Sequence, residues 1–190
     1  PSFPASKSLC ALGGMLANNA GGEKSLSYGK TEDYVEELSV VLSDGNEYQF
    51  KELSKDELEK KKSQQNLEGE IYCKMYDLIE NNYDAIKAAK PNVSKNSAGY
   101  YLWNVWDRSK FNLVKLLVGS QGTLGIITKA KLRLIKPKTH SELLVMFLKD
   151  LKPLAEIVNI IKPYKPETFE SFDDHTMSLA VRFLPDMIKK

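Results

Sequence analysis

Apolar and polar positions alternate along two stretches of the chain, which predicts β-strands there. From Glu37 to Leu42 the apolar residues Leu38, Val40 and Leu42 fall on one face. Asp44-Gly45 is a turn signal, and Glu47 to Phe50 returns as the second strand of a β-hairpin. The alternation recurs from Gly125 to Leu134. In that strand one face is expected to carry Ile126, Thr128, Ala130, Leu132 and Leu134, and the other Lys129, Lys131 and Arg133.

A helical spacing of apolar residues occupies most of residues 54–90. Ser54 is a candidate N-cap with Glu57 as its capping-box partner, and Pro91 ends the pattern. The charged part, Leu53 to Asn66, is interpreted as an exposed helix or a mobile insertion. The following part is expected to form a core helix rather than a ligand-binding stripe; its apolar and aromatic positions are Ile71, Tyr72, Met75, Tyr76, Leu78, Ile79, Tyr83 and Ile86.

The order of elements changes after Pro137, which predicts a domain boundary. A strand at Glu142 to Leu148 is followed by a helix from about Pro153 to Ile161. A second strand is expected at Thr168 to Phe172, before a helix capped by Asp173 or Asp174. We therefore divide the chain into residues 1–137 and a second, incomplete domain at 138–190.

Composition and charge exclude several classes of protein. The chain is 42% hydrophobic and 27% charged with a net charge of +2, so nucleic acid is not an expected partner. No apolar run is long enough for a transmembrane segment. Cys10 and Cys73 make no disulfide framework, which favours a reduced, cytoplasmic location. The chain begins at Pro1 without an initiator Met and is interpreted as a piece of a longer protein.

Two glycine-rich segments carry the candidate chemistry. The first is Gly13-Gly14 to Gly21-Gly22, and the second is Gly119 to Thr128. Glycines let a backbone approach a flat or anionic ligand and present its N–H groups. The first segment is not G-x-G-x-x-G after a strand, which disfavours a Rossmann dinucleotide site. A sharp structural turn at the first segment and a bulged start of a strand at the second remain the alternatives.

Together these segments resemble the FAD-binding (PCMH-type) domain of the vanillyl-alcohol-oxidase family. Many members read G-G-x-x-x-x-N-x-x-G…Y-G-x-x-x-D, matched here from Gly13 to Asp33. They read G-S-E-G-T-L-G-I-I-T in the second region, matched from Gly119 to Thr128 except at Gln121. The segment Asn96 to Tyr100 is also similar to a family pattern. The resemblance is to the branch of D-lactate, glycolate and D-2-hydroxyglutarate dehydrogenases.

The resemblance implies an α+β fold with an antiparallel sheet flanked by helices, followed by the start of an α+β cap domain. It implies FAD as cofactor, a D-2-hydroxy acid as substrate of the whole protein, and hydride transfer to the flavin. Peripheral membrane association of the whole protein stays open, as does the electron acceptor. The residues it implies for cofactor binding are Ala5, Ser6, Ala11, Gly13, Gly14, Asn18, Asn19, Gly21, Gln121, Gly122, Thr123, Gly125 and Ile126.

The family's upstream phosphate-binding loop and its late substrate-binding cluster are not found in this sequence. We therefore expect weak FAD binding and little turnover from these 190 residues, with catalytic residues elsewhere. His140 and His175 have no neighbours at metal-ligand spacing, so no metal site is expected. Another FAD-linked enzyme of the fold stays an alternative, such as an alcohol or aldonolactone oxidase or a UDP-sugar enolpyruvyl reductase. So does a non-catalytic interaction module that uses the charged helix at residues 54–66.

Overall fold

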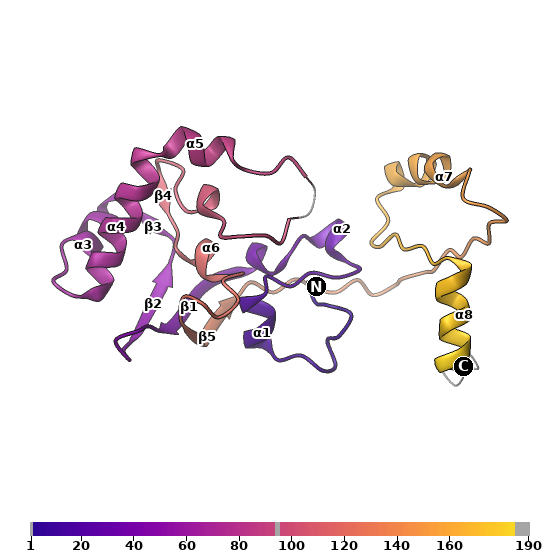
Figure 1. The fold of residues 1–190 in the computed structure, drawn as a ribbon, viewed down its shortest axis with the longest axis horizontal. Coiled ribbons are helices and arrows are strands. Elements are labelled where there is room, and N and C mark those ends of the chain that lie inside the picture. Colours follow the sequence, from indigo (N-terminus) through magenta and orange to yellow (C-terminus); the bar gives the residue numbers. More distant parts are fainter. Residues whose placement is uncertain (1, 94–95, 185–190) are drawn as a thin grey trace. The chain divides into compact units, whose positions relative to one another are not determined.

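The computed structural model describes residues 2–93 and 96–184, and the chain divides into two compact units at Leu144/Val145. The first unit carries an antiparallel sheet and most of the helices (Figure 1), so the expected α+β fold is confirmed. The domain boundary expected after Pro137 stays a prediction, because a compact unit is not by itself a functional domain. None of the described helices is long and apolar enough to cross a membrane.

The sheet of the first unit follows the predicted hairpin. Its strand order is β2-β1-β5, with β1 at Val35–Val41, β2 at Glu47–Lys51 and β5 at Ile126–Leu132. Both pairings are antiparallel. At the hairpin turn, Gly45 takes a φ of 79°, and the Asp44 carboxylate accepts the Asn46 N–H at 3.1 Å. These two residues explain why the chain reverses there.

A β-bulge changes the expected faces of β5. Ser39 pairs with Lys129 and Val40 pairs with Ile127, so Thr128 is the extra residue. Ile127, Ala130 and Leu132 therefore pack against the core, whereas Ile126 is 70% exposed. The prediction that Ile126 and Thr128 share the inward face with Ala130 is wrong, because an inserted residue reverses the alternation at that point.

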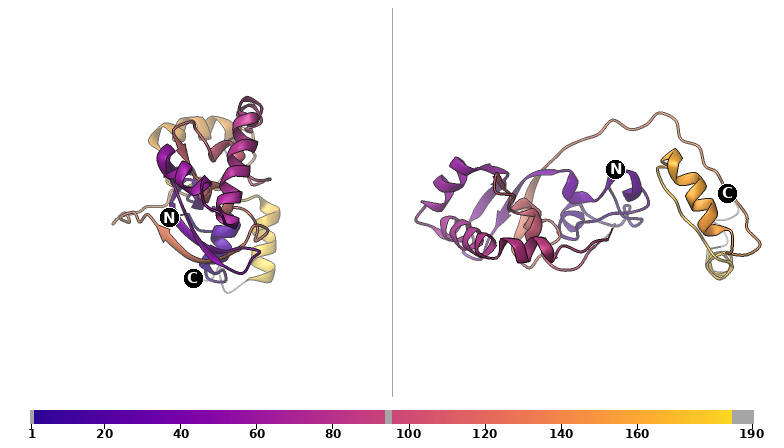
Figure 2. Two further views of the ribbon diagram at one scale, coloured as in Figure 1. Left: turned by 90° about the vertical axis from the view of Figure 1, so that its left-hand side faces the viewer. Right: turned by 90° about the horizontal axis from the view of Figure 1, so that it is seen from above.

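The helical region consists of three helices, where the sequence predicted a charged segment followed by one core helix. These are α3 at Lys55–Lys62, α4 at Leu67–Asn81 and α5 at Tyr83–Ala88. The predicted cap is confirmed: Glu57 donates its N–H to the Ser54 hydroxyl at 3.3 Å, and its carboxylate accepts the Ser54 N–H at 2.9 Å. The views in Figure 1 and Figure 2 place α3 and α4 at the opposite end of this unit from α1 (Leu12–Ala17) and α2 (Ser25–Tyr28).

The core of the unit includes a cluster of aromatic rings between α4 and β4. Tyr72 and Phe111 have ring centroids 5.9 Å apart, and both side chains are buried. Phe111 lies in β4 (Lys110–Phe111), which pairs with β3 (Leu53–Ser54). Of the predicted core positions of α4, Leu78 is 48% exposed and that expectation is wrong. Ile79, which was also predicted to lie in the core, is fully buried.

Short 3-10 turns and a short helix complete the first unit. They are η1 at Thr31–Asp33, η2 at Leu102–Asn104 and α6 at Val114–Leu117. α6 packs on β1, and it directly precedes the second glycine-rich segment. The packing of α6 on β1 therefore fixes where the second glycine-rich segment begins.

The second unit contains only helical elements among its described residues. These are α7 at Leu154–Ile161, η3 at Lys162–Tyr164 and α8 at Asp174–Phe183, which is capped by the Asp173 side chain. The strands predicted at Glu142–Leu148 and Thr168–Phe172 are wrong. A strand needs a hydrogen-bonded neighbour, and the described part of this region provides none. Phe147 is accordingly 94% exposed.

The Tyr72 hydroxyl makes a testable contribution to stability. It is buried and has no hydrogen-bond partner among the described residues. Burial, and then the charge of Glu68, raise its pKa. Because an unpaired buried polar group costs free energy, Tyr72→Phe should raise the free energy of unfolding by about 1 kcal/mol. Urea unfolding followed by tryptophan fluorescence measures this.

Tyr34→Phe is the matched control for that prediction. The Tyr34 hydroxyl donates to the Tyr28 carbonyl at 2.7 Å, so its removal should lower the free energy of unfolding by about 1 kcal/mol. A loss of stability in Tyr72→Phe equal to that in Tyr34→Phe would contradict the assignment of an unpaired hydroxyl.

Candidate functional site

The two glycine-rich segments lie against each other although about a hundred residues separate them in the sequence. Gly119 donates its N–H to the Leu16 carbonyl at 3.0 Å, and Gln121 donates its N–H to the Ala17 carbonyl at 2.8 Å. The Gln121 side chain also donates to the Asn18 amide oxygen at 3.2 Å. The C-terminal end of α1 and the second segment therefore form one continuous surface.

Left-handed backbone conformations allow this close approach. Asn19 has a φ of 48°, and Gln121 has a φ of 56°. Gly119 and Gly122 also have positive φ values, of 87° and 76°. Asparagine and glycine tolerate this region better than other residues do. Asn19, Gly119 and Gly122 are thus residue types suited to the reversals after α1 and α6, whereas Gln121 is not.

Some of the glycines are required by packing inside the protein. A Cβ added to Gly22 would lie 2.1 Å from the Phe3 carbonyl oxygen, and one added to Gly125 would lie 2.5 Å from Val40 Cγ1. At Gly119 an added Cβ would come within 3.2 Å of Asn19 Cβ. The tight space at Gly125 agrees with a strand that begins against β1, which is the alternative that the sequence left open for this residue.

Other glycines face open space. A Cβ added to Gly13, Gly14 or Gly122 would meet no atom within 4 Å. All three are exposed. Ala11 is the N-cap residue of α1, and its methyl side chain cannot cap the N–H groups of the first turn. Open, side-chain-free backbone at this surface fits a ligand that lies close to the chain. Packing within the described residues does not explain these three glycines.

The polar side chains at this surface differ in their exposure and in their hydrogen-bond partners. Asn18 and Gln121 are exposed. Asn19 is buried: its side-chain oxygen accepts the Glu32 N–H at 2.9 Å, while its Nδ2 has no partner among the described residues. Thr123 is exposed and its hydroxyl lies 2.6 Å from the Tyr100 hydroxyl. The segment Asn96–Tyr100, singled out from the sequence, thus reaches the same surface through Tyr100.

The remaining predicted residues lie around this surface. Ala5, Ser6 and Ala11 are exposed, and the residues before Ala5 lie beside Gly22. An added Cβ at Gly21 would lie 2.7 Å from the Ser25 hydroxyl, so Gly21 packs inside the first segment. Ile126 is exposed at the start of β5. His140 is exposed outside any helix or strand and His175 is exposed in α8, and neither lies near this surface in the sequence.

Comparison with known proteins identifies the first segment. Residues 1–51 match the family of the FAD binding domain, and this range holds the first glycine-rich segment and the β1–β2 hairpin. These residues are therefore similar to an FAD binding domain. The predicted resemblance and the expected FAD cofactor are confirmed. The second segment lies outside the matched range, and its backbone hydrogen bonds connect it to α1, which lies within that range.

Curated relatives match the chain over most of its length. D-2-hydroxyglutarate dehydrogenase from Pseudomonas putida is 28% identical over 90% of this chain and 17% of its own length. Glycolate oxidase subunit GlcD from Bacillus subtilis is 29% identical over 93% of this chain and 27% of its own length. D-lactate dehydrogenase from Anaerostipes hadrus is 30% identical over 77% of this chain and 20% of its own length. The chain thus spans about a quarter or less of these relatives.

Proposed function

We propose that the joined glycine-rich surface is one wall of the FAD site of an oxidoreductase. The observation that carries the proposal is the backbone hydrogen bonding between the two segments, at Gly119 and Gln121. The open backbone at Gly13, Gly14 and Gly122 supports it, because a cofactor can approach there without meeting a side chain.

The proposal assigns different roles to the predicted residues. Gly13, Gly14 and Gly122 present backbone to the cofactor, and Asn18, Gln121 and Thr123 provide side-chain hydrogen bonds. Asn19, Gly21 and Gly125 hold the shape of the wall, because each is packed against the protein itself. Ala5, Ser6, Ala11 and Ile126 lie at its edges. FAD bound at this wall would supply the redox chemistry as the acceptor of a hydride.

The substrate class follows from the names of the relatives. D-2-hydroxyglutarate, glycolate and D-lactate are all 2-hydroxy acids. We propose that the whole protein oxidises a D-2-hydroxy acid, with the general base and substrate-binding groups outside these 190 residues. Residues 138–190 are proposed as the beginning of a cap domain. The two unpaired cysteines support a cytoplasmic location.

The activity is tested on the protein that carries this chain. D-lactate, glycolate and D-2-hydroxyglutarate are each mixed anaerobically with it, and the flavin absorbance is followed. Rapid bleaching by one D-2-hydroxy acid, with L-lactate as the control, is the expected result. Bound flavin that no 2-hydroxy acid bleaches would contradict the substrate class, and a protein without flavin would contradict the cofactor.

The location of the cofactor wall is tested on the 190-residue chain by amide NMR. Millimolar FAD should shift the N–H signals of Gly13, Gly14 and Gly122. Gly45 is the matched control, because it is exposed in the β1–β2 turn and belongs to neither segment. This measurement detects weak binding. Shifts centred away from the glycine-rich surface would overturn the assignment of the wall.

Gly14→Ala should separate the stability of the fold from cofactor binding. The added methyl group meets nothing within 4 Å, and alanine is a better helix former than glycine. We expect a gain of about 0.5–1 kcal/mol in the free energy of unfolding, together with smaller FAD-induced shifts at Gly13 and Gly122. Unfolding in urea and the same NMR titration measure the two effects. Unchanged FAD shifts would show that Gly14 does not face the cofactor.

A further inference from the structure

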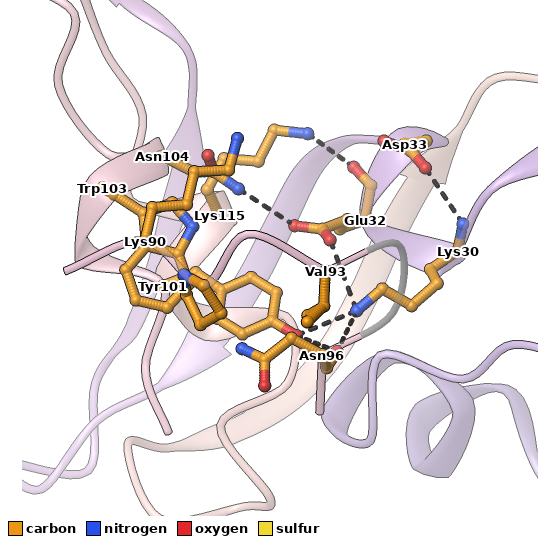
Figure 3. A pocket seen from close by; sticks show the side chains of 11 residues that line it. Lys30, Glu32, Asp33, Lys90, Val93, Asn96, Tyr101, Trp103, Asn104 and Lys115 are labelled. Atoms are coloured by element: carbon orange, nitrogen blue, oxygen red, sulfur yellow. Dashed lines mark hydrogen bonds and ion pairs between the residues drawn. The ribbon is translucent and has the colours of Figure 1, made fainter. Parts of the chain in front are cut away.

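A pocket lies in the first unit, and none of the residues predicted to bind FAD lines it. It has a volume of about 500 Å³, which is within the range of small-molecule sites. Its lining comes from η1, from the segment after α5, from η2 and from α6. Figure 3 shows these side chains converging from segments that are far apart in the sequence.

One wall of this pocket is held together by an ion pair, a hydrogen bond and stacked aromatic rings. The Lys30 amino group lies 3.7 Å from the Glu32 carboxylate, and both side chains are largely buried. Lys30 also donates to the Tyr101 hydroxyl at 2.8 Å. The Tyr101 ring stacks on Trp103 with centroids 5.0 Å apart. The acidic charge of Glu32 is therefore balanced by Lys30, whereas Asp33 adds a second carboxylate to the lining. Tyr101 is buried with Lys30 over its ring, so the flat apolar surface is that of Trp103.

The lining also contains Lys90 and Lys115, so its three lysines outnumber its two carboxylates, Glu32 and Asp33. Lys115 donates to the Glu32 backbone carbonyl at 2.6 Å, which is a neutral acceptor. In the part of the chain that the structure describes, neither Lys90 nor Lys115 forms an ion pair. Figure 3 shows both amino groups on the same side of the pocket as the Asn104 side chain.

We propose that this pocket binds a small organic anion whose planar part lies on the Trp103 ring. Lys90 and Lys115 supply the opposite charge, and the Asn104 amide supplies a further polar group. Ammonium groups and an amide recognise carboxylate and phosphate oxygens alike. An anion is favoured because the lysines of the lining outnumber its carboxylates by one, and the Trp103 ring favours an organic anion over an inorganic ion.

The experiment is an NMR titration of the 190-residue chain with phenyl phosphate and, separately, with phthalate. The Trp103 indole N–H signal should shift in a saturable way with one or both anions. Trp106 is an internal control, because its indole N–H is held by the Glu80 carboxylate at 2.7 Å. The tighter of the two ligands decides between phosphate and carboxylate. The absence of saturable shifts with both anions at millimolar concentration would overturn the proposal.

Charge variants locate the binding site. Lys90→Met and Lys115→Met should each weaken binding tenfold or more. Lys60→Met is the matched control, because it removes the same charge from an exposed position of α3 and should leave binding unchanged. If Lys115→Met does not fold, Lys90→Met decides, because Lys90 is exposed at the rim. Equal affinities in the Lys90 and Lys60 variants would show that only net charge matters, which would also overturn the proposal.

Discussion

Phe111→Ala should lower the free energy of unfolding of the first unit by about 3–5 kcal/mol, the range for truncating a buried aromatic side chain. Phe111 is fully buried, and its ring centroid lies 5.9 Å from that of Tyr72, 6.4 Å from that of Tyr76 and 5.8 Å from that of Trp106. The substitution removes the ring that joins α4 to β4. Urea unfolding followed by the fluorescence of the two tryptophans reports on this unit.

Phe147→Ala is the control for this loss. It makes the same chemical change at a side chain that is 94% exposed, so the free energy of unfolding should change by no more than about 0.5 kcal/mol. Similar losses in the two variants would mean that the aromatic cluster does not hold the first unit together.

Gly125→Ala should cost about 3–4 kcal/mol of unfolding free energy and displace the second glycine-rich segment. The new Cβ would lie 2.5 Å from Val40 Cγ1 and 2.8 Å from the Val41 carbonyl oxygen, so β1 or β5 must move. Gly125 also has a positive φ, which adds a conformational cost. The same unfolding measurement gives the stability, and the Gly119 and Gln121 amide signals should shift with it.

Gly45→Ala separates the cost of the positive φ from the cost of the close contact with β1. Gly45 also has a positive φ, but an added Cβ meets nothing within 4 Å. Its cost should therefore be conformational alone, about 1 kcal/mol. A loss in Gly125→Ala no larger than that in Gly45→Ala would contradict the close packing of Gly125 on β1.

Local signals in the sequence were sufficient for the elements of the first unit. The hairpin turn at Asp44-Gly45 and the cap formed by Ser54 and Glu57 depend on neighbouring residues, and both appear as predicted. The bulge at Thr128 was not predictable from alternation, because a periodic pattern contains no sign of an inserted residue. The strand expected at Glu142–Leu148 failed for a related reason, since apolar character alone cannot supply a pairing neighbour.

The candidate site was only partly predictable from the sequence, because the sequence does not show which residues the fold packs together. The density of glycines marked both segments, but it could not tell Gly125, which packs on β1, from Gly122, which faces open space. The anion pocket was missed entirely. Lys90 and Lys115 look like ordinary surface lysines in the sequence, and only the fold brings them beside Trp103. The only local sign of this pocket in the sequence was the pair of aromatic residues Tyr101 and Trp103, whose rings stack in the structure.

The hydrogen bonds from Gly119 and Gln121 to α1 set a minimum length for any shortened version of this protein. A piece that stops at residue 51 would keep the whole family match and both strands of the hairpin, yet it would lack β5 and the partners of Leu16 and Ala17. The stretch recognised by its sequence is therefore smaller than the stretch that can fold. Useful truncations must retain the chain at least to Leu132, where β5 ends.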